Sequence, residues 1–365
     1  MPSRGPVRYA IVGLGHIAQV AMLPAFAHAG NSRLAAVVSG DRAKRREVAR
    51  RYRTAAYGYE DYEACLEQVD AVYIALPNHQ HADFTIRAAR AGVHVLCEKP
   101  LAVTAADCRR MIAACERHGV KLMTAYRLHF EAINLEVVDL VRKGAIGEPK
   151  FFNSSFSMTV RRGDIRTRKA FGGGSLYDIG VYCINAARYL FRAEPKDVMA
   201  ISVNSGVKAL AEIDESTAAI LRFDGERVAS FVTSFNAGSV AEYRIVGTKG
   251  DIHVDPAYEY AEGLGYTITV DGKAKRKTIG RRDQFAPQLI HFSDCILRDR
   301  TPEPSGEEGL QDVRIVEALY RSAETGKAVA IPPFRKTRRP TGRQRISRPG
   351  VRKPALVKVQ SASVD

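Results

Sequence analysis

The segment Gly13-Leu14-Gly15-His16-Ile17-Ala18 constrains the fold more than any other part of this sequence. It follows an apolar run at residues 9–12 and opens a helical pattern at residues 17–28. In a G-x-G-x-x-A turn the first glycine permits a tight bend and the second lets the backbone approach a pyrophosphate. The small alanine lets the helix pack on the strand, and the helix amino terminus faces the phosphates. Because the motif lies between a strand and a helix, it predicts dinucleotide binding rather than only a tight turn.

Apolar runs and helical patterns alternate from this motif to about residue 125. The expected strands cover residues 9–12, 34–38, 71–76, 93–97 and 121–125. The expected helices cover residues 17–28, 43–52, 81–91 and 104–118. This alternation favours right-handed βαβ units and a doubly wound parallel sheet, so we predict a Rossmann domain over residues 1–125.

The pattern changes in residues 126–334. One helix is expected at 176–189, and two more at about 284–298 and 307–325. Extended segments are expected near residues 197–204, 217–223, 228–235, 242–247 and 266–271. Consecutive strands joined by short turns predict a mostly antiparallel sheet, and therefore an α+β domain.

The end of the second strand bears on the choice of dinucleotide. Ser39 and Gly40 stand where an NAD site has an acidic residue, and Arg42 and Lys44 follow closely. A hydroxyl with cations suits a 2′-phosphate, which favours NADP. Asp41 leaves NAD open, because another loop register would bring its carboxylate to the ribose. The basic run taken alone also suits an exposed helix face.

Two further segments end strands of the expected parallel sheet, where ligands of such sheets bind. They are Leu76-Pro77-Asn78-His79-Gln80-His81 and Glu98-Lys99-Pro100. A lysine beside a positively charged nicotinamide and partly shielded from water loses its proton more easily, so Lys99 can exchange a proton during hydride transfer. The alternative for Lys99 is a surface salt bridge with Glu98.

A glycine run at residues 172–174 leads into the helix expected at 176–189. Asp178 and Tyr182 are four residues apart and therefore share one face of that helix. A carboxylate and a phenol that face a lysine can pass a proton to or from a substrate hydroxyl. Helix capping by Asp178 and core packing of Tyr182 are the structural alternatives.

Composition narrows the class of protein and its setting. No apolar run approaches the roughly 20 residues of a membrane span, and the amino terminus lacks the pattern of a secretory signal. Six scattered cysteines without a C-x-x-C pair are typical of reduced thiols, so we expect a cytoplasmic protein. Histidine and cysteine spacing predicts no metal site.

Basic residues gather at the carboxyl terminus. Residues 335–365 hold ten of the 55 lysines and arginines and one acid, which accounts for much of the net charge of +15. With three prolines and little apolar periodicity, this tail is expected to be disordered. A solvated tail is favoured over contact with nucleic acid or another acidic surface.

In order, the segments AIVGLG, LPN-x-x-H, CEKPLA, AYR-x-H, GGGSLYDIGVY and GEEGLQDVR closely resemble the glucose–fructose oxidoreductase/inositol dehydrogenase (Gfo/Idh/MocA) family. The likeness covers about residues 7–330 and is nearest the glucose–fructose oxidoreductase branch. It implies a Rossmann domain, a second domain with a large open sheet often used for oligomers, and hydride transfer between NAD(P) and a sugar or polyol.

The resemblance also implies roles for single residues. Lys99 matches the lysine that binds the reacting hydroxyl, Tyr182 the acid/base position, and Asp178 the substrate-binding carboxylate. The predicted catalytic set is Lys99, Tyr182 and Asp178. The predicted cofactor-binding set is Gly13, Leu14, Gly15, His16, Ile17, Ser39, Gly40, Arg42, Lys44, Tyr59, Leu76, Pro77, Asn78, His81, Glu98, Lys99 and Arg127.

Two departures from the family's pattern refine these expectations. Periplasmic members of the branch carry an arm before the first strand that helps retain NADP. Few residues precede Tyr9 here, which favours an exchanging cofactor. The basic loop at residues 161–169 could recognise an acidic or phosphorylated sugar, and a solvated loop or subunit contact is the alternative.

We therefore predict a homo-oligomeric, NADP-dependent sugar oxidoreductase that oxidises an aldopyranose at C1 or runs the reverse reduction. One alternative is a coupled aldose–ketose oxidoreductase with retained NADP. The other is a catalytically silent NADP-binding protein that acts through its basic tail. We expect no membrane partner.

Overall fold

The computed structural model describes residues 5–336 and 338–364, and these form two compact units. The first unit runs to Arg127 and also contains Asp283–Leu310 and Ser347–Ser361. The second contains Leu128–Arg282, Gln311–Ile346 and the chain from Ala362. The chain therefore crosses between the units several times, whereas local sequence patterns suggest a single crossing near residue 125.

The first unit is built on a six-stranded sheet with the order β3-β2-β1-β4-β5-β6. Its strands are β1 (Val7–Val12), β2 (Ser32–Val38), β3 (Ala55–Tyr57), β4 (Ala71–Ile74), β5 (His94–Cys97) and β6 (Leu122–Thr124). All neighbouring strands run parallel, as the strand–helix alternation predicts. The order reverses between β1 and β4, which is the position where open parallel sheets bind ligands.

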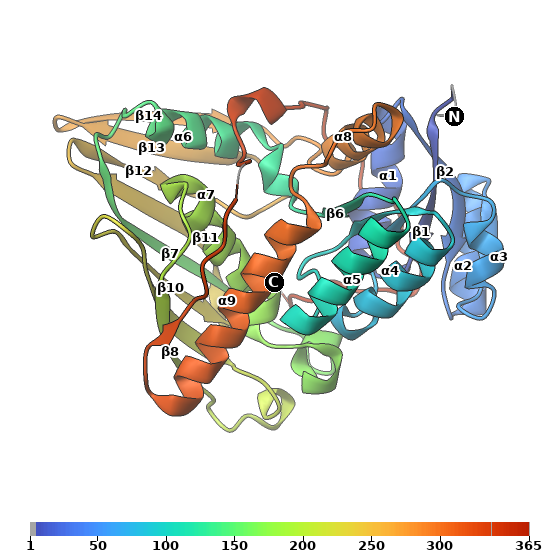
Figure 1. Ribbon diagram of the computed structural model, residues 1–365, viewed down its shortest axis with the longest axis horizontal. Helices are drawn as coiled ribbons and strands as arrows, with labels where there is room; N and C mark the ends of the chain where they lie inside the picture. The colour runs from blue at the N-terminus through green and yellow to red at the C-terminus, as the bar shows by residue number, and fades with distance from the viewer. Residues whose placement is uncertain (1–4, 337, 365) are drawn as a thin grey trace. The chain divides into compact units, whose positions relative to one another are not determined.

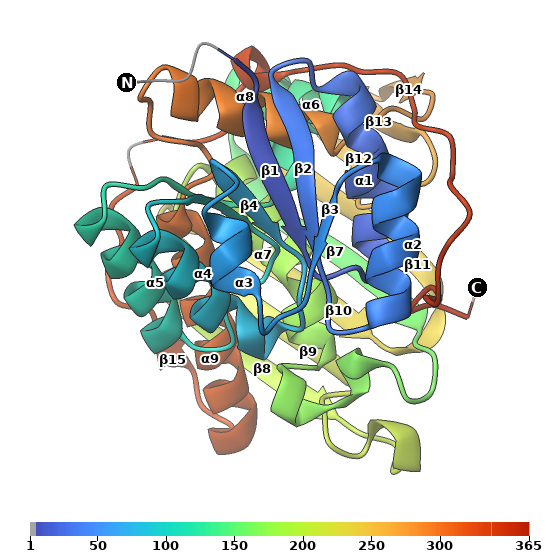
Figure 2. The ribbon, with the colours of Figure 1, turned by 90° about the vertical axis from the view of Figure 1, so that its right-hand side faces the viewer.

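Helices cover both faces of this sheet. They are η1 (Ala18–Met22), α1 (Leu23–Ala25), η2 (Phe26–His28), α2 (Arg42–Tyr52), α3 (Tyr62–Leu66), η3 (Asn78–Gln80), α4 (His81–Arg90), α5 (Ala105–Arg117) and α8 (Ala286–Leu297). Figure 2 shows α1 and α2 on one side of the sheet and α4 and α5 on the other. The late helix α8 belongs here because Ser293 Oγ lies 2.8 Å from both Tyr9 Oη and Ser32 Oγ.

The second unit is built on a nine-stranded sheet with the order β14-β13-β12-β11-β7-β10-β9-β8-β15. Its strands are β7 (Pro149–Thr159), β8 (Asp197–Val203), β9 (Ser216–Arg222), β10 (Val228–Ser234), β11 (Asn236–Gly247), β12 (Gly250–Val254), β13 (Leu264–Val270), β14 (Lys273–Ile279) and β15 (Val329–Ala330). The pairing of β7 with β10 is parallel, and β7 and β11 pair antiparallel. The sheet is mostly antiparallel, which confirms the predicted α+β class.

One face of this sheet carries the core of the unit. The helices α6 (Ala132–Arg142), α7 (Val181–Phe191) and α9 (Gly306–Thr325) lie on that face in Figure 1. Alternate strand residues such as Phe152, Phe231 and Ile245 point toward them and are buried. The opposite face carries the intervening residues, several of them large, apolar and exposed.

The sequence leads us to expect reduced cysteines and no membrane-spanning helix. All six cysteines lie in the described chain as buried thiols. Within residues 5–336 and 338–364, none of the helices is both long and apolar enough to cross a membrane.

Candidate active site

The turn after β1 has the geometry that the fingerprint predicts. Gly13 has φ of +94°, and a Cβ there would lie 2.5 Å from the carbonyl oxygen of Ala75, so only glycine fits. A Cβ on Gly15 would meet nothing within 4 Å, so open space lies beside the backbone that would approach a pyrophosphate. Ala18 is fully buried where the helix packs. The turn therefore suits a dinucleotide on three independent counts.

The loop after β2 is organised around Asp41. One carboxylate oxygen of Asp41 accepts a hydrogen bond of 2.9 Å from the backbone N–H of Lys44 and caps α2. Arg45 donates to the carbonyl of Ser39 at 3.0 Å. A Cβ on Gly40 would lie 3.1 Å from the ring of Tyr59, so glycine lets that ring cover the loop. Four residues of the predicted cofactor set, Ser39, Gly40, Lys44 and Tyr59, are thus brought together.

His81 joins the loops that follow β4 and β5. It is fully buried, with Nε2 2.9 Å from the Leu76 carbonyl oxygen and Nδ1 3.0 Å from that of Pro100. Burial lowers the pKa of His81, although both carbonyl contacts act against this shift. The two loops are therefore held to each other. In the loop that follows β5, the Lys99–Pro100 bond is cis. A direct contact of His81 or Asn78 with a cofactor stays a prediction.

Glu98 gathers several polar groups beside Lys99. Its carboxylate accepts hydrogen bonds from the hydroxyl of Tyr73 and, at 3.2 Å, from the backbone N–H of Lys99. Loss of water raises the pKa of Glu98, while Tyr73 and the charges of Lys99 and Arg127 partly offset the rise. Arg127 is itself buried and donates to Gln284. Glu98, Lys99 and Arg127 thus form one charged cluster at the carboxyl edge of the sheet.

Asp178 and Tyr182 belong to the second unit. Asp178 lies on η7 (Leu176–Gly180) and Tyr182 on the first turn of α7, and both are half-buried while most of their helix neighbours are buried. The ring of Tyr182 packs against Phe156 and Tyr258, with centroid distances of 5.6 and 5.8 Å. The η7 segment, which holds Asp178, is a π-helical turn, a feature that is frequent at functional sites.

Asp178 is paired with Arg166, which sequence reasoning did not anticipate. Arg166 Nε donates to Asp178 Oδ2 at 2.7 Å, and its Nη1 lies 3.2 Å from Asp164 Oδ1. These carboxylates raise the pKa of Arg166, against the effect of burial. Another loop arginine, Arg168, pairs with Glu212. Part of the positive charge in loop 161–169 is therefore engaged inside the unit, which weakens the hypothesis that the loop binds an acidic sugar.

The residue that caps this helix is Asp214, not Asp178. Asp214 Oδ2 accepts from the backbone N–H of Leu176 at 3.0 Å and from the hydroxyl of Ser175 at 2.6 Å. Its Oδ1 accepts from Tyr320 at 2.5 Å. Asp214 is buried, which raises its pKa. The cap of this helix thus comes from Asp214, and the carboxylate of Asp178 is paired with Arg166 instead. No local pattern marks Asp214, because it is 38 residues from the helix that it caps.

The structure brings together the residues of two groups. The first unit gathers the turn of Gly13, the loop of Ser39 and the cluster around Lys99, and the second gathers Arg166, Asp178 and Tyr182. A joint action of Lys99 with Tyr182 and Asp178 stays a prediction.

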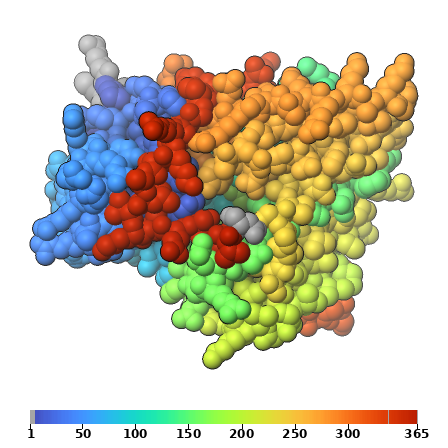
Figure 3. Space-filling model, turned by 180° about the vertical axis from the view of Figure 1, so that it is seen from behind, coloured from blue at the N-terminus to red at the C-terminus, as the bar shows by residue number. Residues whose placement is uncertain are grey.

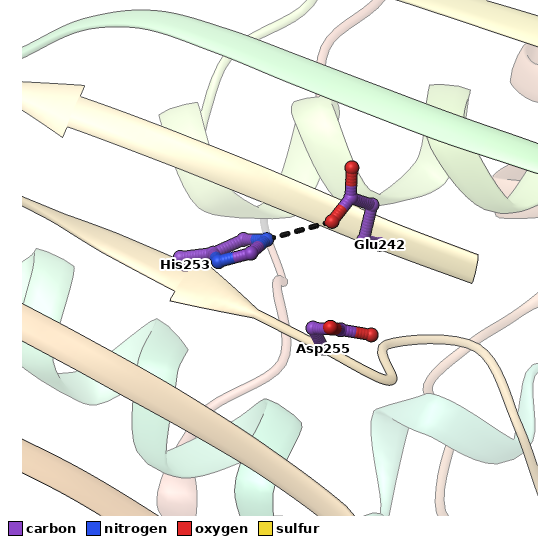
Figure 4. A group of neighbouring side chains, drawn as sticks. All are labelled: Glu242, His253 and Asp255. Carbon is purple, nitrogen blue, oxygen red and sulfur yellow. Dashed lines mark hydrogen bonds and ion pairs between the residues drawn. The ribbon is translucent and has the colours of Figure 1, made fainter. Parts of the chain in front are cut away.

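A separate group of side chains lies on β11, β12 and the following loop (Figure 4). Glu242, His253 and Asp255 offer ligand atoms that lie within 4.8 Å of one another. His253 Nε2 is 2.8 Å from Glu242 Oε2, and Asp255 is exposed. The ion pair accounts for the closest of these contacts. Ligand spacing in the sequence could not reveal the group, because the sheet brings its members together.

The Rossmann sheet, the Gly13 turn and the cluster around Lys99 together define a nicotinamide-dinucleotide-dependent oxidoreductase. Residues 7–126 match the family model "Oxidoreductase family, NAD-binding Rossmann fold", and residues 134–253 match the "GFO/IDH/MocA C-terminal domain". The chain belongs to this Gfo/Idh/MocA family, which confirms the resemblance inferred from its motifs.

Three proteins similar to this chain are a dehydrogenase, an oxidoreductase and a ketoreductase. The D-xylose 1-dehydrogenase [NADP(+)] of Haloarcula marismortui is 30% identical, over 89% of this chain and 93% of that protein. The aldose-aldose oxidoreductase of Caulobacter crescentus is 39% identical, over 89% of this chain and all of that one, with a TM-score of 0.86. An Actinomadura kijaniata 3-ketoreductase, solved with NADP and TDP-benzene, is 27% identical over 87% and 98%, with a TM-score of 0.80.

Proposed function

We propose that this protein transfers a hydride between NADP and a sugar, oxidising an aldopyranose at C1 or running the reverse reduction. The observation that carries the proposal is the cluster of Glu98, Lys99 and Arg127, which His81 ties to the loop after β4. That loop in turn lies against the Gly13 turn, which supports our proposal that Lys99 transfers a proton beside the bound nucleotide. The similarity to an NADP-dependent xylose dehydrogenase supports NADP as the cofactor and a sugar as the substrate.

Bound NADP would accept or supply the hydride at nicotinamide C4. In the oxidation, the sugar C1–H bond breaks with its electron pair and the hydroxyl proton leaves the substrate. The phenolate form of Tyr182 would take this proton and become the phenol, assisted by the ammonium of Lys99, and Asp178 would orient the sugar by accepting a hydrogen bond. Arg166 would hold Asp178 in place through its 2.7 Å contact. In the reduction the same groups would act in the opposite sense.

A coupled reaction is the second candidate. The 39% identical relative is an aldose-aldose oxidoreductase, and this name favours an exchange in which one sugar is oxidised and another reduced. Such an enzyme needs no added cofactor, whereas a dehydrogenase consumes one NADP per turnover.

The first test is a panel of aldoses, ketoses, polyols and sugar phosphates given to the purified protein with added NADP or NAD. We expect reduced nicotinamide to form with an aldose and NADP, and more slowly with NAD. Turnover of a sugar pair without added cofactor would instead support the coupled reaction. No turnover with any member of the panel would contradict both.

We also propose that a second copy of this chain covers the outer face of the nine-stranded sheet. That face exposes large apolar side chains, and a folded monomer rarely leaves so much apolar surface in water. They are Phe151, Met199, Ile201, Ile220, Val228 and Val232. The cytoplasmic location expected from the sequence stays a prediction. The expectation of a solvated basic tail is wrong for part of that segment, because Arg339 pairs with Glu194 and the backbone of Val357 is hydrogen-bonded to Gln19.

A further inference from the structure

The carboxyl-terminal segment follows the surface of the first unit, although its composition predicts disorder. Ser347–Ser361 belong to that unit, and Figure 3 shows this late part of the chain in red over the blue amino-terminal residues. We call residues 355–358 the strap. The strap lies outside both family models, which match residues 7–126 and 134–253.

The strap is fastened to the turn that would hold the pyrophosphate. The side chain of Gln19 donates to the Val357 carbonyl at 3.0 Å and accepts from the Val357 N–H at 2.8 Å. The same amide nitrogen donates to the carbonyl of Leu14 at 2.9 Å. Gln19 is buried and Val357 is half-buried, so this pair of hydrogen bonds is partly shielded from water. A buried side chain thus joins the strap directly to the Gly13–Gly15 turn.

The strap is also fastened to the loop after β2. Arg51 on α2 donates to the carbonyl of Ala355. Lys358 Nζ lies 3.6 Å from Asp41 Oδ2, the oxygen of Asp41 that does not cap α2. The backbone N–H of Lys44 and, to a smaller extent, the charge of Lys358 lower the pKa of Asp41. The strap therefore spans the two loops that would bind the pyrophosphate and the adenosine ribose.

An ionised Asp41 beside a 2′-phosphate would repel it, and NADP binding would suffer unless a cation compensated. Lys358 offers this compensation, because its ammonium has three N–H donors and its side chain is 58% exposed. It can pair with Asp41 and with a phosphate at the same time. From these contacts we propose that Lys358 is a specificity-determining residue that recognises the 2′-phosphate of NADP, and that the strap closes one side of the nucleotide site.

This inference rests on the proposed use of NADP, and it is tested by measuring the dissociation constants of NADP and NAD by calorimetry. In Lys358→Ala we expect NADP to bind about tenfold more weakly, the lower end for one charge-assisted hydrogen bond. NAD binding should change by less than about twofold, because NAD lacks the phosphate. Lys353→Ala is the matched control, since Lys353 is an exposed lysine of the same segment.

The strap itself is tested by hydrogen exchange and by a second variant. Bound NADP should slow amide exchange in residues 355–358. Val357→Pro removes the N–H that donates to Gln19, and we expect it to weaken NADP and NAD by similar factors. An unchanged ratio of NADP to NAD affinity in Lys358→Ala, or unchanged exchange in the strap, would overturn the inference while leaving the proposed function intact. A wild-type protein that binds neither dinucleotide would overturn the proposed function as well.

Discussion

Replacing Lys99 with methionine is expected to lower the turnover number by about 10²- to 10⁴-fold, the usual contribution of a positioned proton-transfer group. Methionine keeps most of the volume of the side chain and removes its charge and its donors. The backbone N–H of residue 99 can still donate to Glu98, and the dinucleotide loops keep their other contacts. NADP should therefore bind within a few-fold of its wild-type affinity. Steady-state kinetics combined with calorimetry separates the two effects.

Lys143→Met is the matched control for this experiment. Lys143 is exposed at the end of α6 and is not among the residues assigned to catalysis. The control should keep wild-type turnover and wild-type NADP binding. If Lys99→Met also kept full turnover, the role assigned to the lysine would be wrong. If it lost NADP binding to the same extent as turnover, Lys99 would contribute to the affinity for NADP rather than to proton transfer.

Replacing Arg188 with alanine is expected to lower the free energy of unfolding by about 3–5 kcal/mol, because it removes the cation that pairs with the buried carboxylate of Asp312. Arg188 and Asp312 are both fully buried, with Nη1 2.6 Å from Oδ1. Arg188 Nε also lies 2.7 Å from Glu194 Oε2. Asn185 donates to the other oxygen of Asp312 at 2.9 Å, but an amide does not neutralise its charge. Urea unfolding followed by circular dichroism measures the loss.

Arg142→Ala is the control for the arginine network. Arg142 is 45% exposed and pairs with Asp139 one turn away on α6, so its loss should cost less than about 1 kcal/mol. The double variant Arg188→Met with Asp312→Leu should recover much of the lost stability, because it removes both buried charges. Equal losses for Arg188→Ala and Arg142→Ala would show that the buried network contributes little.

Local sequence patterns predicted the regular elements of the first unit closely. The expected helix at 104–118 is α5, where the Thr104 hydroxyl accepts from the backbone N–H of Asp107 at 3.0 Å. The expected strands match β1, β2, β4, β5 and β6 to within two residues at each end. These elements are buried runs with caps and glycine stops, so short-range physics marks them. The edge strand β3 is only three residues long and was not predicted.

The central strand β7 was also not predicted, for a different reason. Its inward positions include Ser154, whose hydroxyl donates to the carbonyl of Glu242 at 2.7 Å. Its outward positions include Phe151, an apolar residue in the place where alternation expects a polar one. The usual alternation is thus reversed at both positions, because the strand's outer face is apolar and its inner face holds a buried hydrogen bond.

The residues of the candidate site could be predicted where they belong to a sequence motif. They could not be predicted where residues far apart in the sequence come into contact. Gly13, Ser39, Glu98 and Lys99 belong to strand ends, which the parallel topology brings to one edge. Asp214 reaches its helix across 38 residues, and the strap is held mainly through its backbone carbonyls and N–H groups. Backbone contacts leave no mark in side-chain composition, so a basic segment rich in proline could only be expected to be disordered.

Transfer of an isotopic label tests the central claim most directly. The protein is given NADP and an aldopyranose with deuterium at C1, D-xylose first, and the reduced cofactor is analysed by mass spectrometry. We predict deuterium at nicotinamide C4 and the C1-oxidised sugar in equal amounts, with label transfer slowed in Lys99→Met as much as turnover. A protein that binds NADP but transfers no label from any aldopyranose, in either direction, would contradict the proposed hydride transfer.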